Sequence, residues 1–232
     1  MLHTEVMDDV RLLTIDRPER RNALDHATLD ALVEALTPED QRVVVLTGAG
    51  GHFCAGADLT GVEDQAFVAR LQEVLERLVA APFVTMAAID GAALGAGTQL
   101  AVACDLRLAT PGATFGIPAA KLGLAVDSWT VDRVALLAGH STAQAMLLAA
   151  EVVDGVAAHR MGLVQRLGTL DDALGWAKEI TSLAPLTIQA HKAALRGSPE
   201  AKAARDRAWA SADLQEGLAA FRERRPPEFN GH

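Results

Sequence analysis

The chain has 232 residues, of which 50% are hydrophobic and 22% charged, a balance typical of a globular protein that can bury a core. Its formal net charge of −9 argues against binding to nucleic acid or an anionic membrane surface, since both need a basic face. The N-terminus has acids where a secretion signal needs a basic start, and no apolar run reaches the roughly 20 residues of a membrane span. We therefore expect a soluble, cytoplasmic protein.

The first 110 residues alternate between predicted strands and predicted helices. The expected strands, in which apolar residues alternate or run continuously, are 10–16, 42–48, 83–90 and 106–110. The expected helices, in which apolar residues recur at helical spacing, are 23–36 and 64–80. Helices that connect strands in this way favour parallel pairing, so the expected fold class is α/β.

The chain becomes mainly helical after about residue 130. The expected helices there are 131–138, 141–150, 171–184, 186–196 and 200–224. Ser141 and Thr169 stand at two helix starts and are expected N-caps. Lys192 lies on one of the late helices, where we expect an interface between subunits.

Two glycine-rich loops, 49–59 and 90–105, each follow a predicted buried strand, at the edge where α/β sheets bind ligands. Neither loop is a dinucleotide or phosphate loop: G-x-G-x-x-G would need glycine where Phe53 stands, and G-x-x-x-x-G-K-[ST] is absent. The only cysteines, Cys54 and Cys104, lack metal-ligand spacing, so we expect two reduced core residues and no metal.

The loops contain two similar turns, "CAGAD" and "LGAGT", and each places a small residue at the start of a helical segment. Backbone N–H groups at such starts are unpaired and carry partial positive charge. Two of them that converge on one point would form an oxyanion hole. Spacing alone leaves a second interpretation open, in which both are simply tight strand-to-helix turns.

Longer segments around these turns carry a specific resemblance. "LTGAGGHFCAGADL", "IDGAALGAGTQLAVACDLRLA", "IDRPERRNAL" and "FGIPAAKLGL" closely resemble the enoyl-CoA hydratase/isomerase (crotonase) superfamily, in order along nearly the whole chain. The resemblance implies a ββα spiral core over 1–174 and a C-terminal helical trimerisation region over 175–232. It also implies a homotrimer, or a hexamer built as a dimer of trimers, whose ligand is an acyl-CoA thioester without a further cofactor.

The resemblance also assigns residues to a candidate site. The oxyanion donors would be the backbone N–H groups of Ala57 and Ala96. The positions that would line the acyl-CoA path or bind its phosphates are Arg20, Arg21, Ala23, Ala55, Gly56, Asp58, Leu59, Gly95, Pro118, Leu122 and Trp129. A solvated basic turn is the other interpretation of Arg20 and Arg21.

Hydratases of this superfamily use two glutamates around one water, and both positions differ here. The first is Gln99, three residues after Ala96, and the second is Ala119, which follows Pro118. A positioned acid or base contributes about 10²–10⁴-fold to rate, and neither an amide nor a methyl group can exchange the proton. An oxyanion hole alone binds the thioester carbonyl without accelerating hydration.

Asp127, in "GLAVDSWT", is the remaining candidate carboxylate. Related dehalogenases carry a nucleophilic aspartate in this loop, and burial among apolar neighbours would raise its pKa towards use as a base. Alternatively, Asp127 caps the helix that starts near Ser128. Trp129 is either a core residue or a ligand contact.

These residues support one main function and two alternatives. The main hypothesis is an acyl-CoA binder without hydratase activity, in fatty acid and lipid metabolism. Within the superfamily the "GLA-x-D" loop and "RPP-x-F" tail are most similar to a mycobacterial branch that lacks both glutamates. That implies supply of acyl-CoA to mycolic acid synthesis in an actinobacterium, with partner proteins in fatty acid synthesis. The alternatives are an acyl-CoA isomerase, dehalogenase or thioester hydrolase that uses Asp127, and a structural trimer subunit.

Overall fold

The computed structural model describes residues 1–37, 41–60 and 65–232, and its centre is a six-stranded sheet. The strand order is β1 (Leu2–Met7), β2 (Val10–Ile15), β3 (Val43–Gly48), β4 (Val84–Ile89), β6 (Leu106–Ala109) and β9 (Arg166–Leu167). All neighbours are parallel except the β1–β2 hairpin. The predicted α/β class is confirmed.

A second, three-stranded sheet carries one of the glycine turns. It consists of β5 (Ala92–Leu94), β7 (Thr114–Gly116) and β8 (Val152–Asp154), with β7 in the middle. Strand β5 begins three residues after β4 ends and leads directly into α3 (Ala96–Ala103). The second glycine-rich loop is therefore a strand, a turn and a buried helix start.

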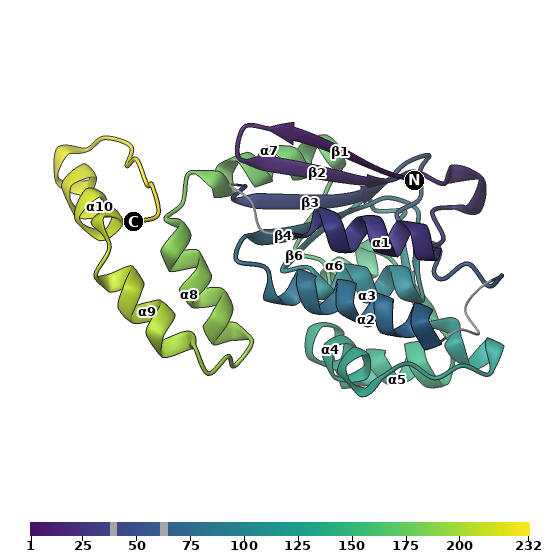
Figure 1. Cartoon of the computed structure of the whole chain (residues 1–232). Helices are drawn as coiled ribbons and strands as arrows, with labels where there is room; N and C mark the ends of the chain where they lie inside the picture. Colours follow the sequence, from purple (N-terminus) through teal and green to yellow (C-terminus); the bar gives the residue numbers. More distant parts are fainter. Residues whose placement is uncertain (38–40, 61–64) are drawn as a thin grey trace.

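Helices cover both faces of the large sheet (Figure 1). One face packs on α1 (His26–Ala35), α2 (Gln65–Ala80) and α3, whose apolar residues share one large core. The other face packs on α7 (Leu170–Thr181), which contacts β2, β3 and β4. Both faces of β3 and β4 are therefore buried, which explains their continuous apolar runs.

Further helices precede α7 in the chain, namely η1 (Pro18–Arg20), η2 (Pro118–Leu122), α4 (Ser128–Ala138), α5 (His140–Leu148) and α6 (Gly155–Arg160). Of these, α4 and α5 lie below the sheet in Figure 1. In the part of the chain that the structure describes, no helix is both long and apolar enough to cross a membrane.

Helices α8 (Pro185–Leu195), α9 (Ala201–Trp209) and α10 (Ala212–Glu223) extend away from the sheet (Figure 1). Lys192 anchors α8, because its buried ammonium lies 2.6 Å from Asp105 and donates to the carbonyl of Phe83 at 2.9 Å. Lys192 therefore serves packing within the chain, and its predicted place in a subunit interface is wrong. The predicted boundary at 174/175 falls within α7 and stays a prediction.

Most predicted elements are confirmed, with their ends shifted by a few residues. The predicted helix 64–80 corresponds to α2, which starts at Gln65. Residue 64, the first of the predicted helix, lies outside the described residues. The predicted helix 200–224 is two helices, because Ser211 caps α10 after α9 has ended. Thr169 is the N-cap of α7, as expected, and forms a capping box with Asp172. Ser141 is not the N-cap of α5: Gly139, at φ +84°, is both the C-cap of α4 and the N-cap of α5.

Candidate functional site

The two glycine turns lie side by side in the structure. Cys54 forms a parallel bridge with Ala93: its N–H donates to Ala92 at 2.8 Å, and its carbonyl accepts from Leu94 at 3.0 Å. The first loop therefore continues the small sheet alongside β5. This pairing places the residues after Cys54 beside the start of α3.

The backbone N–H of Ala57 points away from its neighbouring chain segment. Leu24 donates to the carbonyl of Gly56 and accepts from the N–H of Asp58, both at 2.8 Å. Because peptide groups alternate along an extended segment, the N–H of Ala57 faces the opposite side. Ala96 is the first residue of α3, after Gly95 as N-cap, so its N–H is one of the unpaired helix-start groups. Within the described ranges, neither N–H has an acceptor.

Glycine permits the close approach of the two turns. Gly56 and Gly95 have φ of +116° and +54°, and these backbone conformations are strained for any residue with a side chain. A Cβ on Gly97 would lie 2.0 Å from the carbonyl oxygen of Cys54, so α3 packs its backbone directly on the first loop. A Cβ on Gly56 would lie 3.9 Å from the nitrogen of Ala96, which shows how near the second donor is.

Both donors open into a cavity of about 290 Å³ between α2, the two turns and the segment 117–127. Of the predicted site residues, those that line it are Ala55, Gly56, Ala57, Leu59, Gly95, Ala96, Gln99, Pro118, Ala119, Leu122 and Asp127. The other lining residues are mainly apolar, namely Phe67, Val68, Leu71, Gln72, Leu75, Ile117, Leu124, Ala125 and Val126. The remaining predicted residues, Arg20, Arg21, Ala23, Asp58 and Trp129, do not line it.

Gln99 is held by a polar network in the wall of the cavity. Its Nε2 donates to Thr130 Oγ1 at 2.8 Å and lies 3.4 Å from Asp127 Oδ2. Thr130 Oγ1 in turn donates to Asp127 Oδ2 at 2.8 Å. Gln99 is 7% exposed, so this network fixes the position of its amide in the wall of the cavity. Ala119 adds only a methyl group to the same wall.

Asp127 fits both of its predicted places. It caps α4, because its carboxylate accepts from the N–H of Thr130 at 3.0 Å, and it also lines the cavity. The expectation of burial is wrong: Asp127 is exposed at the rim, because capping the first turn of α4 keeps its carboxylate at the surface. Trp129 is half-buried and packs against the core, as the first of its two interpretations predicts.

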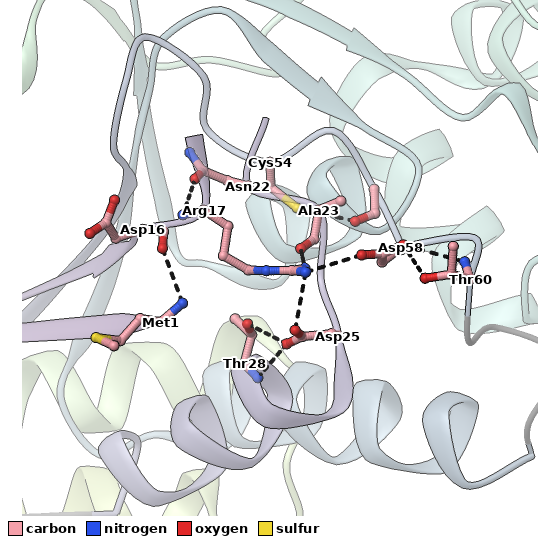
Figure 2. Close-up of polar contacts among 11 residues, drawn as sticks. Met1, Asp16, Arg17, Asn22, Ala23, Asp25, Thr28, Cys54, Asp58 and Thr60 are labelled. Carbon is pink, nitrogen blue, oxygen red and sulfur yellow. Dashed lines mark hydrogen bonds and ion pairs between the residues drawn. The ribbon is translucent and has the colours of Figure 1, made fainter. Parts of the chain in front are cut away.

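Arg20 and Arg21 lie exposed at the end of η1. The sequence analysis missed Arg17, whose guanidinium lies 3.1 Å from the carboxylate of Asp58, the residue after Ala57. Figure 2 shows the Arg17 guanidinium between Asp25, Asp58 and the carbonyl of Ala23. In the sequence Arg17 is one of several charged residues in a polar turn, and nothing there indicates that it pairs with Asp25 and Asp58. The hydroxyl and N–H of Thr60, together with Arg17, hold the pKa of Asp58 below its usual range.

The cysteines are buried and free, as expected, and burial raises the pKa of each thiol to about 12. Cys54 therefore supports the site through its backbone and not as a nucleophile. Among residues 1–37, 41–60 and 65–232, no three side chains of His, Cys, Asp or Glu are grouped as a metal ion would require.

A family model described as enoyl-CoA hydratase/isomerase matches residues 5–232. The chain belongs to this family. The fold is accordingly the crotonase-like fold. The molecule is an enoyl-CoA hydratase-like member of the crotonase superfamily.

Known proteins resemble the chain along its whole length. "Probable enoyl-CoA hydratase echA6" of Mycobacterium leprae is 44% identical over 242 residues, with 97% of each chain covered. The 2,3-dehydroadipyl-CoA hydratase of Escherichia coli is 37% identical, with 96% of this chain and 95% of that one covered. The crystal structure of an enoyl-CoA hydratase from Mycobacterium tuberculosis superposes with a TM-score of 0.90 at 32% identity, covering 100% of this chain and 99% of that one.

Proposed function

We propose that this member of the family binds fatty acyl-CoA thioesters and does not hydrate them. The thioester carbonyl accepts hydrogen bonds from the N–H groups of Ala57 and Ala96, and the acyl chain occupies the apolar cavity beside α2. The observation that carries the proposal is the pair of unpaired N–H groups that open into one apolar cavity. Converging donors of this kind stabilise a carbonyl oxygen as negative charge develops on it.

The absence of hydration follows from the two replaced positions. Gln99 uses its amide N–H to bind Thr130, and Ala119 has no polar group, so neither can move a proton to or from water. Without that transfer, the carbonyl interaction contributes to binding and not to turnover. We further propose that CoA and its thioesters are the only ligands, without a metal or other cofactor.

The role in metabolism and assembly rests on similarity. The mycobacterial relatives of the chain are consistent with a protein that supplies acyl-CoA to lipid synthesis, and mycolic acid synthesis is the branch we favour. The same source supports a cytoplasmic homotrimer or hexamer and partner proteins from fatty acid synthesis. The exposed apolar residues of α8–α10 agree with an assembly, since Trp209 and Phe221 are 70% and 85% exposed.

Titration calorimetry with C4 to C16 acyl-CoAs, alongside a crotonyl-CoA hydration assay on the same preparation, tests the proposal. We expect micromolar or tighter binding and no hydration. Hydration at the rate of an ordinary hydratase would overturn it. In a second comparison, Ala96→Pro removes one donor, and proline is tolerated at the first position of a helix. It should weaken acyl-CoA binding about threefold to tenfold, whereas Ala96→Ser keeps the N–H and should bind normally.

One observation favours a second candidate function. The carboxylate of Asp127 lines the same cavity and could act as a base or nucleophile on a non-standard acyl-CoA, in isomerisation, dehalogenation or thioester hydrolysis. Mass spectrometry of a broad acyl-CoA panel after incubation would detect CoA release or an acyl adduct. Turnover that Asp127→Asn abolishes while binding persists would support this candidate, and an unchanged panel would exclude it.

A further inference from the structure

The guanidinium of Arg17 joins the two chain segments that lie on either side of the Leu24–Ala57 bridge (Figure 2). Its Nη2 lies 3.1 Å from Asp58 Oδ2 and 3.2 Å from Asp25 Oδ2, and its Nη1 donates to the carbonyl of Ala23. The side chains of Arg17 and Asp58 are only 16% and 12% exposed. Ion pairs held away from water are screened less than surface pairs, so this contact restrains the loop.

Ala57 needs such a restraint. The residue before it, Gly56, has no side chain and a φ of +116°, so the local backbone does not by itself fix the direction of the next N–H. The two hydrogen bonds to Leu24 hold Gly56 and Asp58 by their main chain. The Arg17–Asp58 pair is the side-chain contact directly beside Ala57, and Asp58 also accepts from Thr60 Oγ1 at 2.7 Å.

Arg17 is not free to bind a ligand phosphate. Two carboxylates and one carbonyl surround its guanidinium, so its charge is already balanced by Asp25 and Asp58. The pKa of Asp25 is lowered: burial opposes this, but the hydroxyl and N–H of Thr28 and the charge of Arg17 outweigh burial. Both carboxylates are therefore ionised partners of Arg17 at neutral pH.

We propose that Arg17 is a positioning residue for carbonyl binding: it fixes Asp58 against the Ala23–Asp25 segment and so sets the direction of the Ala57 N–H. This inference rests on the proposed function, because it assumes that this N–H binds the thioester carbonyl. Loss of Arg17 leaves the apolar cavity and the Ala96 donor in place. The loss therefore falls on recognition of the carbonyl oxygen and not on binding of the chain or of CoA.

The test compares two ligands of equal chain length, dodecanoyl-CoA and the thioether S-dodecyl-CoA, which has no carbonyl oxygen. We expect the wild-type protein to bind dodecanoyl-CoA more tightly. Arg17→Met should weaken dodecanoyl-CoA binding roughly threefold to tenfold, the range expected for one hydrogen bond, and leave S-dodecyl-CoA within about twofold. Arg17→Lys, which keeps the charge, should recover part of the loss.

Arg70→Met is the matched control, because Arg70 also joins two elements by ion pairs, to Asp30 of α1 and Glu73 of α2, but is 37% exposed and does not line the cavity. It should change neither affinity. Infrared spectra add a second readout: the carbonyl stretch of bound dodecanoyl-CoA should shift less from its free value in Arg17→Met than in the wild type.

The outcomes separate the two proposals. A wild-type protein that binds both ligands equally, or neither, would overturn the proposed function. A wild type that prefers the thioester, with the preference intact in Arg17→Met, would overturn the positioning role alone. Equal loss of both ligands in Arg17→Met would also overturn it, since that pattern belongs to general loss of structure. Should Arg17→Met not fold, Arg17→Lys and Asp58→Asn carry the same comparison.

Discussion

Gln99 differs from a glutamate by one atom, and the structure gives that atom a specific partner. The amide N–H binds Thr130 and faces Asp127, whose carboxylate also accepts from Thr130. A carboxylate cannot donate to either group at neutral pH. The hydrogen bonds of this network fit an amide, and they would oppose a glutamate at this position.

Gln99→Glu should therefore destabilise the protein by about 1–3 kcal/mol at neutral pH, since it removes a buried donor and places a carboxylate next to Asp127. The nearby negative charge raises the folded-state pKa of the new glutamate above its unfolded value. The penalty is therefore full at high pH and disappears as the pH falls through that raised pKa. Melting temperatures from pH 4 to 8 measure it, and a penalty independent of pH would contradict the network.

Gly97→Ala tests the contact between the two turns. The added Cβ would lie 2.0 Å from the carbonyl oxygen of Cys54, a backbone atom that cannot turn aside, so α3 must shift. We expect destabilisation of about 1–3 kcal/mol together with weaker acyl-CoA binding. Gly175→Ala is the control: nothing lies within 4 Å of its Cβ, and alanine in the middle of α7 should stabilise by about 0.5–1 kcal/mol. The free energies of unfolding of both variants, measured by chemical denaturation, test these two opposite expectations.

The sequence predicts the residues of the site unevenly. Ala57 and Ala96 were assigned through the family resemblance, because the spacing of the two turns alone left open that both are simply tight strand-to-helix turns. Arg17 could not be found, because its partner Asp58 is 41 residues away and only the fold brings them together. Arg20 and Arg21 were selected because the resemblance places a cation in their segment, and position in a segment does not specify which side of a turn faces the ligand.

Elements were predicted best where periodicity was strong and long. The buried strands β3 and β4 and the amphipathic α2 follow directly from their apolar patterns. The missed strands β5, β7, β8 and β9 have only two or three residues, too few for a period to appear. Strand β1 was missed because all but its first residue are exposed, so it has no buried face to mark it.

The carboxylate of Glu216 is one of the groups that hold the C-terminal tail after α10, together with that of Asp213. Glu216 accepts from Arg225 at 2.6 and 2.8 Å and from the N–H of Glu228 at 2.8 Å. These bonds lower the pKa of Glu216 to about 2, from 4.5. Because the folded-state pKa is lowered, the stabilisation is present above pH 4.5 and disappears as the pH falls towards 2.

Glu216→Gln should accordingly lower the melting temperature at pH 7 and lose that effect near pH 2. Scanning calorimetry of the two proteins at half-unit intervals between pH 2 and 7 measures the difference. Arg205, which pairs with Asp206 on the exposed face of α9, gives a control in Arg205→Gln, with little effect at either pH. A Glu216→Gln deficit that persists at pH 2 would contradict the assigned role.

At the scale of the whole molecule, α8–α10 leave several large apolar side chains exposed in a single chain, among them Leu195, Trp209 and Phe221. A hollow of about 740 Å³ between these helices is lined by Trp209, Leu214, Leu218 and Phe229, among others. It is larger than the site cavity, and charged side chains such as Lys202, Arg205 and Asp213 also line it. Surfaces of this kind mark contacts between proteins, and here they agree with the proposed trimer or hexamer.

Phe221→Asp should weaken that assembly, because it places a charge on a side chain that is 85% exposed in the single chain and apolar. Light scattering should give three or six times the chain mass of 24.4 kDa for the wild type and a smaller mass for the variant. Val6→Asp, on the edge strand β1 and 66% exposed, is the control that should assemble normally. A wild-type monomer at micromolar concentration would contradict the assembly.

The groups that open into the cavity at the two turns belong to the main chain, and the residues that carry them are already alanines. An alanine scan of the site would pass over both donors and report them as silent. It would assign importance instead to Arg17, Gln99 and Asp127, which surround the donors. Only changes to the peptide group itself, such as proline or an amide-to-ester replacement, can measure how much the two N–H groups contribute to ligand binding. If the two N–H groups bind the thioester carbonyl as proposed, changes in the surrounding side chains would remove catalytic groups from this site and leave carbonyl binding in place.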